Sequence, residues 1–198
     1  MGESHRTRHR KNIPIRYCLA AVLLLLVFAS SKVSGQGIQP GFALGVALPS
    51  LGDYGRRRRP GPLAQLSVLF GDSTRRVRLR IEAEGAWFPG RAPANPPFST
   101  DGDMRILSAF ANLVMAPRWS GLRPYFLLGA GAQRVTVPGV ANPYGAVPGV
   151  RTGFGFEDKV RGWTLRGEVS ANAVLSDFAT GREYRPGTYW PITLGIQF

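Results

Sequence analysis

The chain has 198 residues, with 25 glycines, 16 prolines and only 19% charged residues. One domain of roughly 100 to 200 residues fits this length, and the lack of a low-complexity block excludes a largely disordered protein. Such a high content of turn-forming residues favours an all-β chain with many turns.

The first 35 residues have the three-part order of a secretory signal peptide. A basic start is followed by an apolar run from Cys18 to Ala29, and Val33-Ser34-Gly35 stands before Gln36. The apolar run is too short to span a membrane comfortably as a helix. We therefore predict export with cleavage after Gly35. The alternative is a retained membrane anchor.

Removal of this leader leaves a predicted domain, 36–198, without histidine or cysteine, because His5, His9 and Cys18 lie before it. The leader also holds six of the 25 basic and one of the 12 acidic residues, so the net charge falls from +13 to +8. Basic character in an exported chain favours anionic surfaces such as lipid head groups as partners, and it argues against nucleic acid.

Segments of about ten residues with period-two alternation fill the rest of the chain, separated by Gly, Pro, Asp and Ser. No apolar run after Ala29 approaches the roughly 20 residues of a membrane helix, which excludes a helical membrane protein. We predict eight strands, at about 41–50, 63–71, 76–88, 104–116, 124–135, 149–157, 162–174 and 188–198. Segments 104–116 and 124–135 are apolar on both faces, so their sides stay unassigned. Gly129 and Gly131 lie within the second of them and are expected to make room inside the fold.

Charged residues occupy one face of two predicted strands. They are Arg78, Arg80, Glu82 and Glu84 in the third segment, and Arg166 and Glu168 in the seventh, each row alternating with apolar residues. In a soluble sheet the charged face would meet water, whereas in a membrane barrel it would line the interior and the apolar face would meet lipid.

The connections between segments alternate between long and short. Long links follow the first, third, fifth and seventh segments, and shorter ones follow the second, fourth and sixth. Short turns at one end, long loops at the other and an even strand count are typical of bacterial outer-membrane barrels. This pattern favours the second alternative: an antiparallel up-and-down transmembrane barrel with short periplasmic turns, longer extracellular loops and inward charges.

Aromatic residues cluster near the ends of the predicted strands, as they do at both membrane interfaces. The set comprises Trp87 and Trp190 at long-loop ends and Phe70, Tyr125, Phe156, Trp163 and Phe198 at short-turn ends. Ordinary core aromatics are the alternative explanation.

The last strand places one apolar row on one face, Trp190, Ile192, Leu194, Ile196 and Phe198.

This terminal strand resembles the C-terminal signature of outer-membrane barrels, and the whole of 36–198 is similar to small eight-stranded barrels of the OmpA/OmpX type. The resemblance implies recognition of the terminal row by the barrel assembly machinery. It also implies a location in the outer membrane of a Gram-negative-type bacterium. We expect a monomer whose narrow interior is filled by side chains, without an open pore.

Few residues support site chemistry. The interior charges are expected to form a structural network, with a proton or ion path as the alternative. Asp101, Asp103 and Lys159 are weak catalytic candidates, and two loop carboxylates fall short of the six to eight oxygens that calcium prefers. We predict no catalytic residue, cofactor or metal. Arg56, Arg57, Arg58 and Arg59 form a basic run that would contact lipopolysaccharide, or would only keep a loop solvated.

The pattern as a whole predicts a non-enzymatic outer-membrane barrel with a structural or surface-interaction role. Two alternatives remain. One is a secreted, soluble lipocalin-like barrel that binds an apolar ligand, which would need an apolar cavity. The other is a lipid-modifying barrel enzyme, for which the missing histidine is unfavourable.

Overall fold

The computed structural model describes residues 37–50, 58–71, 75–90, 103–117, 121–136, 145–175 and 187–198. These residues form eight strands: β1 (Ile38–Pro49), β2 (Gly61–Phe70), β3 (Val77–Phe88), β4 (Met104–Met115), β5 (Arg123–Thr136), β6 (Val147–Val160), β7 (Trp163–Val174) and β8 (Thr188–Gln197). The predicted leader, 1–35, lies outside the described residues. No helix in the described ranges is long and apolar enough to cross a membrane.

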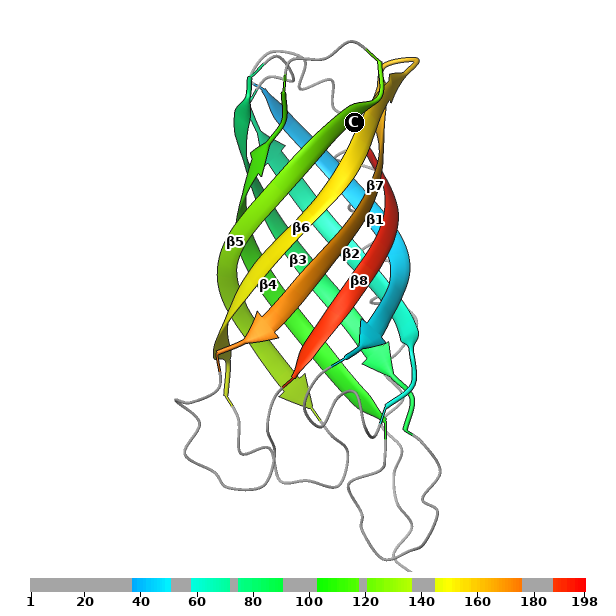
Figure 1. Cartoon of the computed structure of the whole chain (residues 1–198), viewed down its shortest axis with the longest axis vertical. Helices are drawn as coiled ribbons and strands as arrows, with labels where there is room; N and C mark the ends of the chain where they lie inside the picture. The colour runs from blue at the N-terminus through cyan, green and yellow to red at the C-terminus, as the bar shows by residue number, and fades with distance from the viewer. Residues whose placement is uncertain are drawn as a thin grey trace, which may run out of the picture. The chain divides into compact units, whose positions relative to one another are not determined.

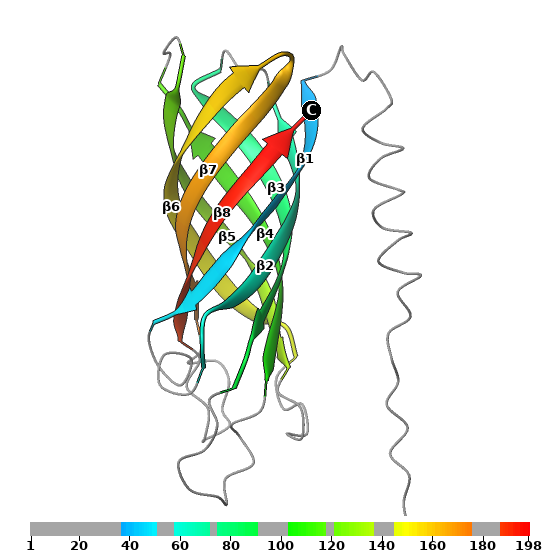
Figure 2. The same ribbon diagram turned by 90° about the vertical axis from the view of Figure 1, so that its right-hand side faces the viewer.

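Each strand pairs antiparallel with the next, and β8 pairs with β1, which closes the sheet into a barrel (Figure 1). The closing ladder runs from Gly41 opposite Gln197 to Pro49 opposite Tyr189. Figure 2 shows β1 and β8, the first and last strands in the sequence, side by side. The predicted fold class, an eight-stranded antiparallel up-and-down barrel, is confirmed.

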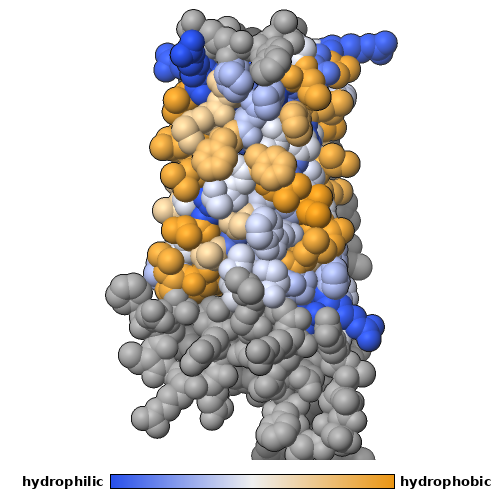
Figure 3. Space-filling view, viewed as in Figure 1, coloured by the Kyte–Doolittle hydropathy of each residue, from blue (hydrophilic) through white to orange (hydrophobic). Residues whose placement is uncertain are grey.

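Period-two alternation determines which side chains face out. In β3, every second residue from Arg78 is buried, and the residues between them are exposed. Large apolar side chains are exposed on all eight strands, and Figure 3 shows those of one face on the wall between the two ends of the barrel. Leu107 is 64% exposed and Leu194 is 75% exposed, which suits an apolar surrounding far better than water.

The structure assigns sides to β4 and β5, which the sequence left open. In β4, Met104 and alternate residues after it are buried, and in β5 Tyr125, Leu127, Gln133 and Val135 are buried. Both faces look apolar in sequence because the barrel interior contains apolar layers as well as charges.

Two apolar clusters flank the polar middle of the interior. One lies toward the long connections and contains Ala47, Leu63, Ala86, Phe88, Met104, Ile106, Val135 and Tyr189. The other lies toward the short turns and contains Leu69, Val114, Ala116, Tyr125 and Leu127. The interior is therefore layered from end to end, apolar, charged and apolar.

Small residues make room for the large interior side chains. A Cβ atom added at Gly129 would lie 2.0 Å from Oδ1 of Asn112, and one added at Gly131 would lie 2.0 Å from the backbone oxygen of Ala109. These glycines allow β4 and β5 to approach closely while the centre stays filled by larger groups.

The connections divide by length between the two ends of the barrel. Residues 50–60, 89–103, 137–146 and 175–187 connect strands at one end, and 71–76, 116–122 and 161–162 connect them at the other. The shortest turn has positive φ at both residues, 51° at Arg161 and 91° at Gly162. Such a two-residue turn matches the twist of a tight hairpin.

Candidate functional site

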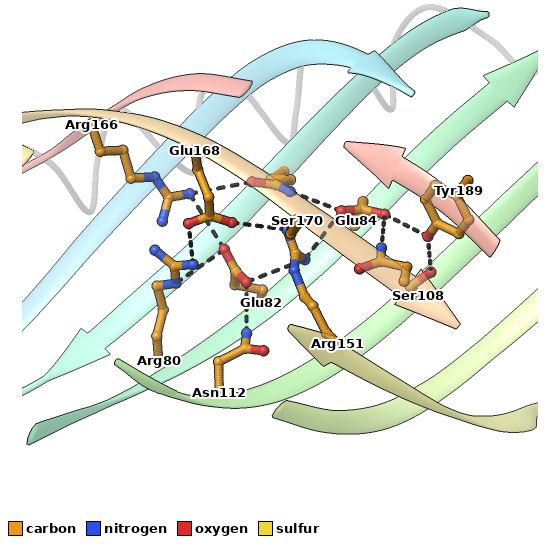
Figure 4. Close-up of polar contacts among 12 residues, drawn as sticks. Arg80, Glu82, Glu84, Ser108, Asn112, Arg151, Arg166, Glu168, Ser170 and Tyr189 are labelled. Atoms are coloured by element: carbon orange, nitrogen blue, oxygen red, sulfur yellow. Dashed lines mark hydrogen bonds and ion pairs between the residues drawn. The ribbon is translucent and has the colours of Figure 1, made fainter. Parts of the chain in front are cut away.

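The main polar constellation is an arginine–glutamate network inside the barrel (Figure 4). β3 contributes four charges from one side, and β6 and β7 contribute four from the other. The eight side chains are Arg78, Arg80, Glu82, Glu84, Arg151, Glu157, Arg166 and Glu168, and none is more than 6% exposed. Six of them form the central network, and Arg78 and Glu157 form a separate pair. All six charges that the sequence analysis assigned to the interior are therefore buried there, five in the central network and Arg78 in a separate group with Glu157.

Glu84 accepts hydrogen bonds from four side chains on four other strands. Tyr189 Oη donates at 2.6 Å and Asn172 Nδ2 at 3.0 Å to Oε1. Gln65 Nε2 donates at 2.8 Å and Arg151 Nη1 at 3.2 Å to Oε2. This carboxylate is fully coordinated by donors, as a buried charge requires.

Arg151 lies at the centre and contacts three carboxylates. Its guanidinium nitrogens lie 3.3 Å from Glu82, 3.2 Å from Glu84 and 3.1 Å from Glu168. A guanidinium with five N–H donors in a fixed plane is suited to such a junction, in which Nη1 faces Glu82 and Glu84 and Nη2 faces Glu168.

Arg80 joins β3 to β7. Its Nη2 atom lies 2.5 Å from Glu168 and its Nε atom 3.2 Å from Glu82. Arg166 Nη2 approaches Glu82 at 3.4 Å, so each of these carboxylates has more than one cationic neighbour. The Arg80–Glu168 and Arg166–Glu82 contacts cross the lumen and connect β3 with β7, which are not paired in the sheet.

A second, smaller group of charges lies toward the short-turn end. Arg78 Nη2 donates to Glu157 Oε1 at 2.7 Å, and Arg123 Nη1 lies 3.6 Å from the same oxygen. The side chain of Arg123 is 13% exposed, so this group lies closer to solvent than the central network.

The prediction of an interface position is wrong for one aromatic residue, Tyr125. Tyr125 is 4% exposed and faces the interior, where its hydroxyl donates to Glu168 at 2.7 Å. A buried tyrosine needs a partner for its hydroxyl, and the carboxylate supplies one. The other six aromatics of that set are exposed on the outer face: Phe70, Trp87, Phe156, Trp163, Trp190 and Phe198.

The basic run at 56–59 differs from a uniformly exposed loop. Arg56 and Arg57 lie outside the described residues, and the side chain of Arg59 is exposed. Arg58 is fully buried and forms a β-bridge with Gly90. This bridge is one residue out of register with the β2–β3 ladder, which turns Arg58 to the buried side. The charge of Arg58 is therefore not presented at the surface.

The C-terminal row lies on the outer wall. Trp190, Ile192 and Leu194 are exposed, Ile196 is half-buried, and Phe198 follows the strand. The Phe198 ring stacks on Phe42 with centroids 6.4 Å apart and meets Trp163 edge-on at 5.8 Å. Its backbone N–H donates to the Pro40 oxygen at 2.9 Å, so Phe198 adds a hydrogen bond to the β1–β8 pairing that closes the barrel.

The sequence pattern does not identify every polar residue of the interior. Arg151 and Glu157 alternate with apolar residues in β6 and are visible as a polar face, but Asn112 and Ser108 lie in a strand that is apolar on both sides. Tyr189 is one residue from Trp190, and only its position in the alternation separates it from the lipid-facing row.

The network has little capacity for bond-making chemistry. Its glutamates are all engaged by arginines, and the described ranges contain no group of three or more His, Cys, Asp or Glu residues that could hold a metal. Asp103 accepts a hydrogen bond from the Gly90 N–H at 3.2 Å, and Asp101 lies outside the described residues. The arrangement is suited to cross-bracing the barrel.

Comparison with solved structures agrees with this architecture. Neisserial surface protein A matches with a TM-score of 0.54 and 17% identity, over 81% of this chain and 94% of that one. The Yersinia pestis outer membrane protein Ail matches at 0.47 and 14%, over 81% and 99%. The chain has the fold of the small outer-membrane β-barrels. The outer membrane enzyme PagL is also similar, at 0.48 and 13% identity over 81% and 98%. No family model and no curated protein matches the sequence.

Proposed function

We propose that this chain is a non-enzymatic outer-membrane protein, a rigid barrel that carries surface-exposed loops and has no open pore. The observation that carries the proposal is the filled interior, in which eight charges are buried and paired, six of them in a network between two apolar layers. An interior occupied in this way leaves the outer wall and the connections as the surfaces for interaction.

The exposed apolar side chains support a membrane location. A soluble lipocalin-like barrel would expose Leu44, Leu107 and Leu194 to water, and each is more than 60% exposed. It would also need an apolar cavity, whereas the centre of this barrel holds arginines and glutamates. Both features favour lipid outside and paired charges inside.

An enzymatic role has less support. The similar fold of PagL does not transfer an activity, because fold and catalytic site are separate properties. Residues 36–198 contain no histidine, and the buried glutamates of the network are held by cations. We therefore assign no catalytic residue and no cofactor.

The proposal includes an orientation and partners. The long connections face outward toward lipopolysaccharide, the short turns face the periplasm, and the leader 1–35 directs export. The barrel assembly machinery inserts the chain by recognising the terminal row that ends at Phe198. We expect the barrel to act as a monomer, because its closed sheet leaves no strand edge for pairing with a second copy.

Fractionation combined with gel mobility tests the proposal. We expect the protein in the outer-membrane fraction, with unboiled samples running as a compact species and boiled samples running as the unfolded chain. Recovery as a soluble exported protein would overturn the membrane assignment. A steady, porin-sized conductance in a planar bilayer would overturn the closed interior.

A further inference from the structure

Three outward side chains gather on the wall at the long-connection end of β3, β4 and β5. The β3–β4 register places Trp87 directly opposite Arg105. The β4–β5 register places Arg105 opposite Thr136 and Leu107 opposite Arg134. Arg105 and Arg134 are therefore diagonal neighbours, at a typical separation of roughly 7–8 Å between backbones. All three side chains are exposed.

These two arginines differ from the arginines of the interior. Arg78, Arg80, Arg151 and Arg166 each have a carboxylate partner, but within the described ranges no hydrogen bond or ion pair is found for Arg105 or Arg134. Asp103, the exposed residue just before β4, accepts instead from the Gly90 N–H at 3.2 Å. Two neighbouring like charges repel each other, and an anion between them would relieve that repulsion.

Their position suits the edge of a membrane. Arg105 is the second residue of β4, and Arg134 is two residues from the end of β5. An outward arginine is strongly disfavoured at the bilayer midplane but is tolerated near an interface. Trp87 supplies an amphipathic ring at the same level, and Leu107, 64% exposed, continues the surface toward the apolar part of the wall.

We propose that Arg105 and Arg134 together bind a phosphate group of the lipid A part of lipopolysaccharide, with Trp87 and Leu107 against its apolar part. Guanidinium groups donate paired N–H bonds to phosphate oxygens, and two of them on adjacent strands hold one phosphate from two sides. A mixed surface of cations and apolar groups fits an anionic head group joined to acyl chains. This site rests on the proposed orientation and is separate from the basic run at 56–59.

The test compares two double variants of equal charge. The full chain is refolded in lipid-free detergent and titrated with bis-phosphorylated lipid A, with its dephosphorylated form and with inorganic phosphate. The R105Q/R134Q variant removes the proposed site, and R75Q/R76Q removes two exposed arginines at the opposite, short-turn end. We expect R105Q/R134Q to weaken binding of phosphorylated lipid A about tenfold or more, and R75Q/R76Q to leave it unchanged.

Each other outcome counts against the site. Equal losses in both variants would mean attraction by net charge alone, and equal binding by wild type and R105Q/R134Q would remove the site altogether. Strong binding of inorganic phosphate alone would mean that the ligand of the site is a free anion and not a lipid. If the double variant fails to close, R105Q and R134Q are tested singly, and each is expected to lose part of the affinity.

Failure of this inference is distinguishable from failure of the proposed function. The mobility of unboiled samples reports barrel closure, and fractionation reports the membrane location, for wild type and for both variants. A closed, outer-membrane barrel that binds lipid A equally with or without Arg105 and Arg134 would overturn only the site. A soluble exported protein would overturn the function on which the site rests.

Discussion

At the scale of single residues, Glu84 is the most heavily bonded group of the interior, with four donors from four strands. Replacement by alanine removes the carboxylate and leaves the Arg151 cation with one fewer partner. We expect Glu84→Ala to lower the free energy of unfolding by about 3–5 kcal/mol, the range for breaking a buried ion pair. Urea unfolding of the refolded barrel in detergent measures this.

The matched control is Leu79→Ala on the same strand, where the side chain faces outward and is 41% exposed. This change removes lipid-facing contacts without leaving a buried charge, so its effect should be clearly smaller. If the two variants lose the same stability, the network contributes no more than ordinary packing.

At the scale of strands, the close approach of β4 and β5 depends on glycine. Gly131→Ala would place a methyl group 2.0 Å from the backbone oxygen of Ala109, so the two strands must shift. We expect a loss of about 1–3 kcal/mol, the usual range for overpacking, measured by urea unfolding. Gly85→Ala on β3 is the control, because a Cβ there meets nothing within 4 Å. Equal stability of the two variants would contradict this account.

The terminal strand has both a packing role and a proposed assembly role. Deletion of Phe198 removes its ring contacts with Phe42 and Trp163, each worth roughly 0.5–1.5 kcal/mol. We expect a loss of about 1–3 kcal/mol after refolding, and a much larger fall in the amount of assembled barrel in cells, measured as the heat-shifted band of the membrane fraction.

Phe154→Ala on β6 is the control for Phe198, since that ring is also exposed on the outer wall, at 58%. We expect this variant to assemble normally in cells. If deletion of Phe198 lowers refolded stability and cellular assembly to the same extent, Phe198 is only a packing residue.

Wherever one face of a strand is polar, the sequence predicts both the position of the strand and the face that turns to the interior. In β3 and β7 a slip of one residue would turn arginines and glutamates to lipid, so the alternation alone indicates the register. In β4 and β5 the interior layers are themselves apolar, and composition does not distinguish them from the lipid face. The placement of Tyr125 and Arg58 depends on strand parity and on a register offset at a strand end, which sequence patterns do not specify.

At the scale of the whole molecule, the buried charges and the exposed charges should respond differently to salt. The central ion pairs are buried, whereas Arg105 and Arg134 are exposed. Raising ionic strength from 0.1 to 1 M shortens the screening length from about 10 Å to about 3 Å. We expect the free energy of unfolding in detergent to change by less than about 1 kcal/mol, while lipid A binding weakens. A large drop in stability would mean that ions reach the interior.

The pairing of β1 with β8 affects the order in which the barrel folds. One edge of β1 finds its partner β2 nearby in the chain, but the other edge pairs with the last strand to be synthesised. Contacts between such distant segments form slowly, and an unpaired strand edge is open to pairing with other chains. The first strand made is thus the last to be completed, and the lifetime of its open edge sets the interval during which the chain is exposed to aggregation.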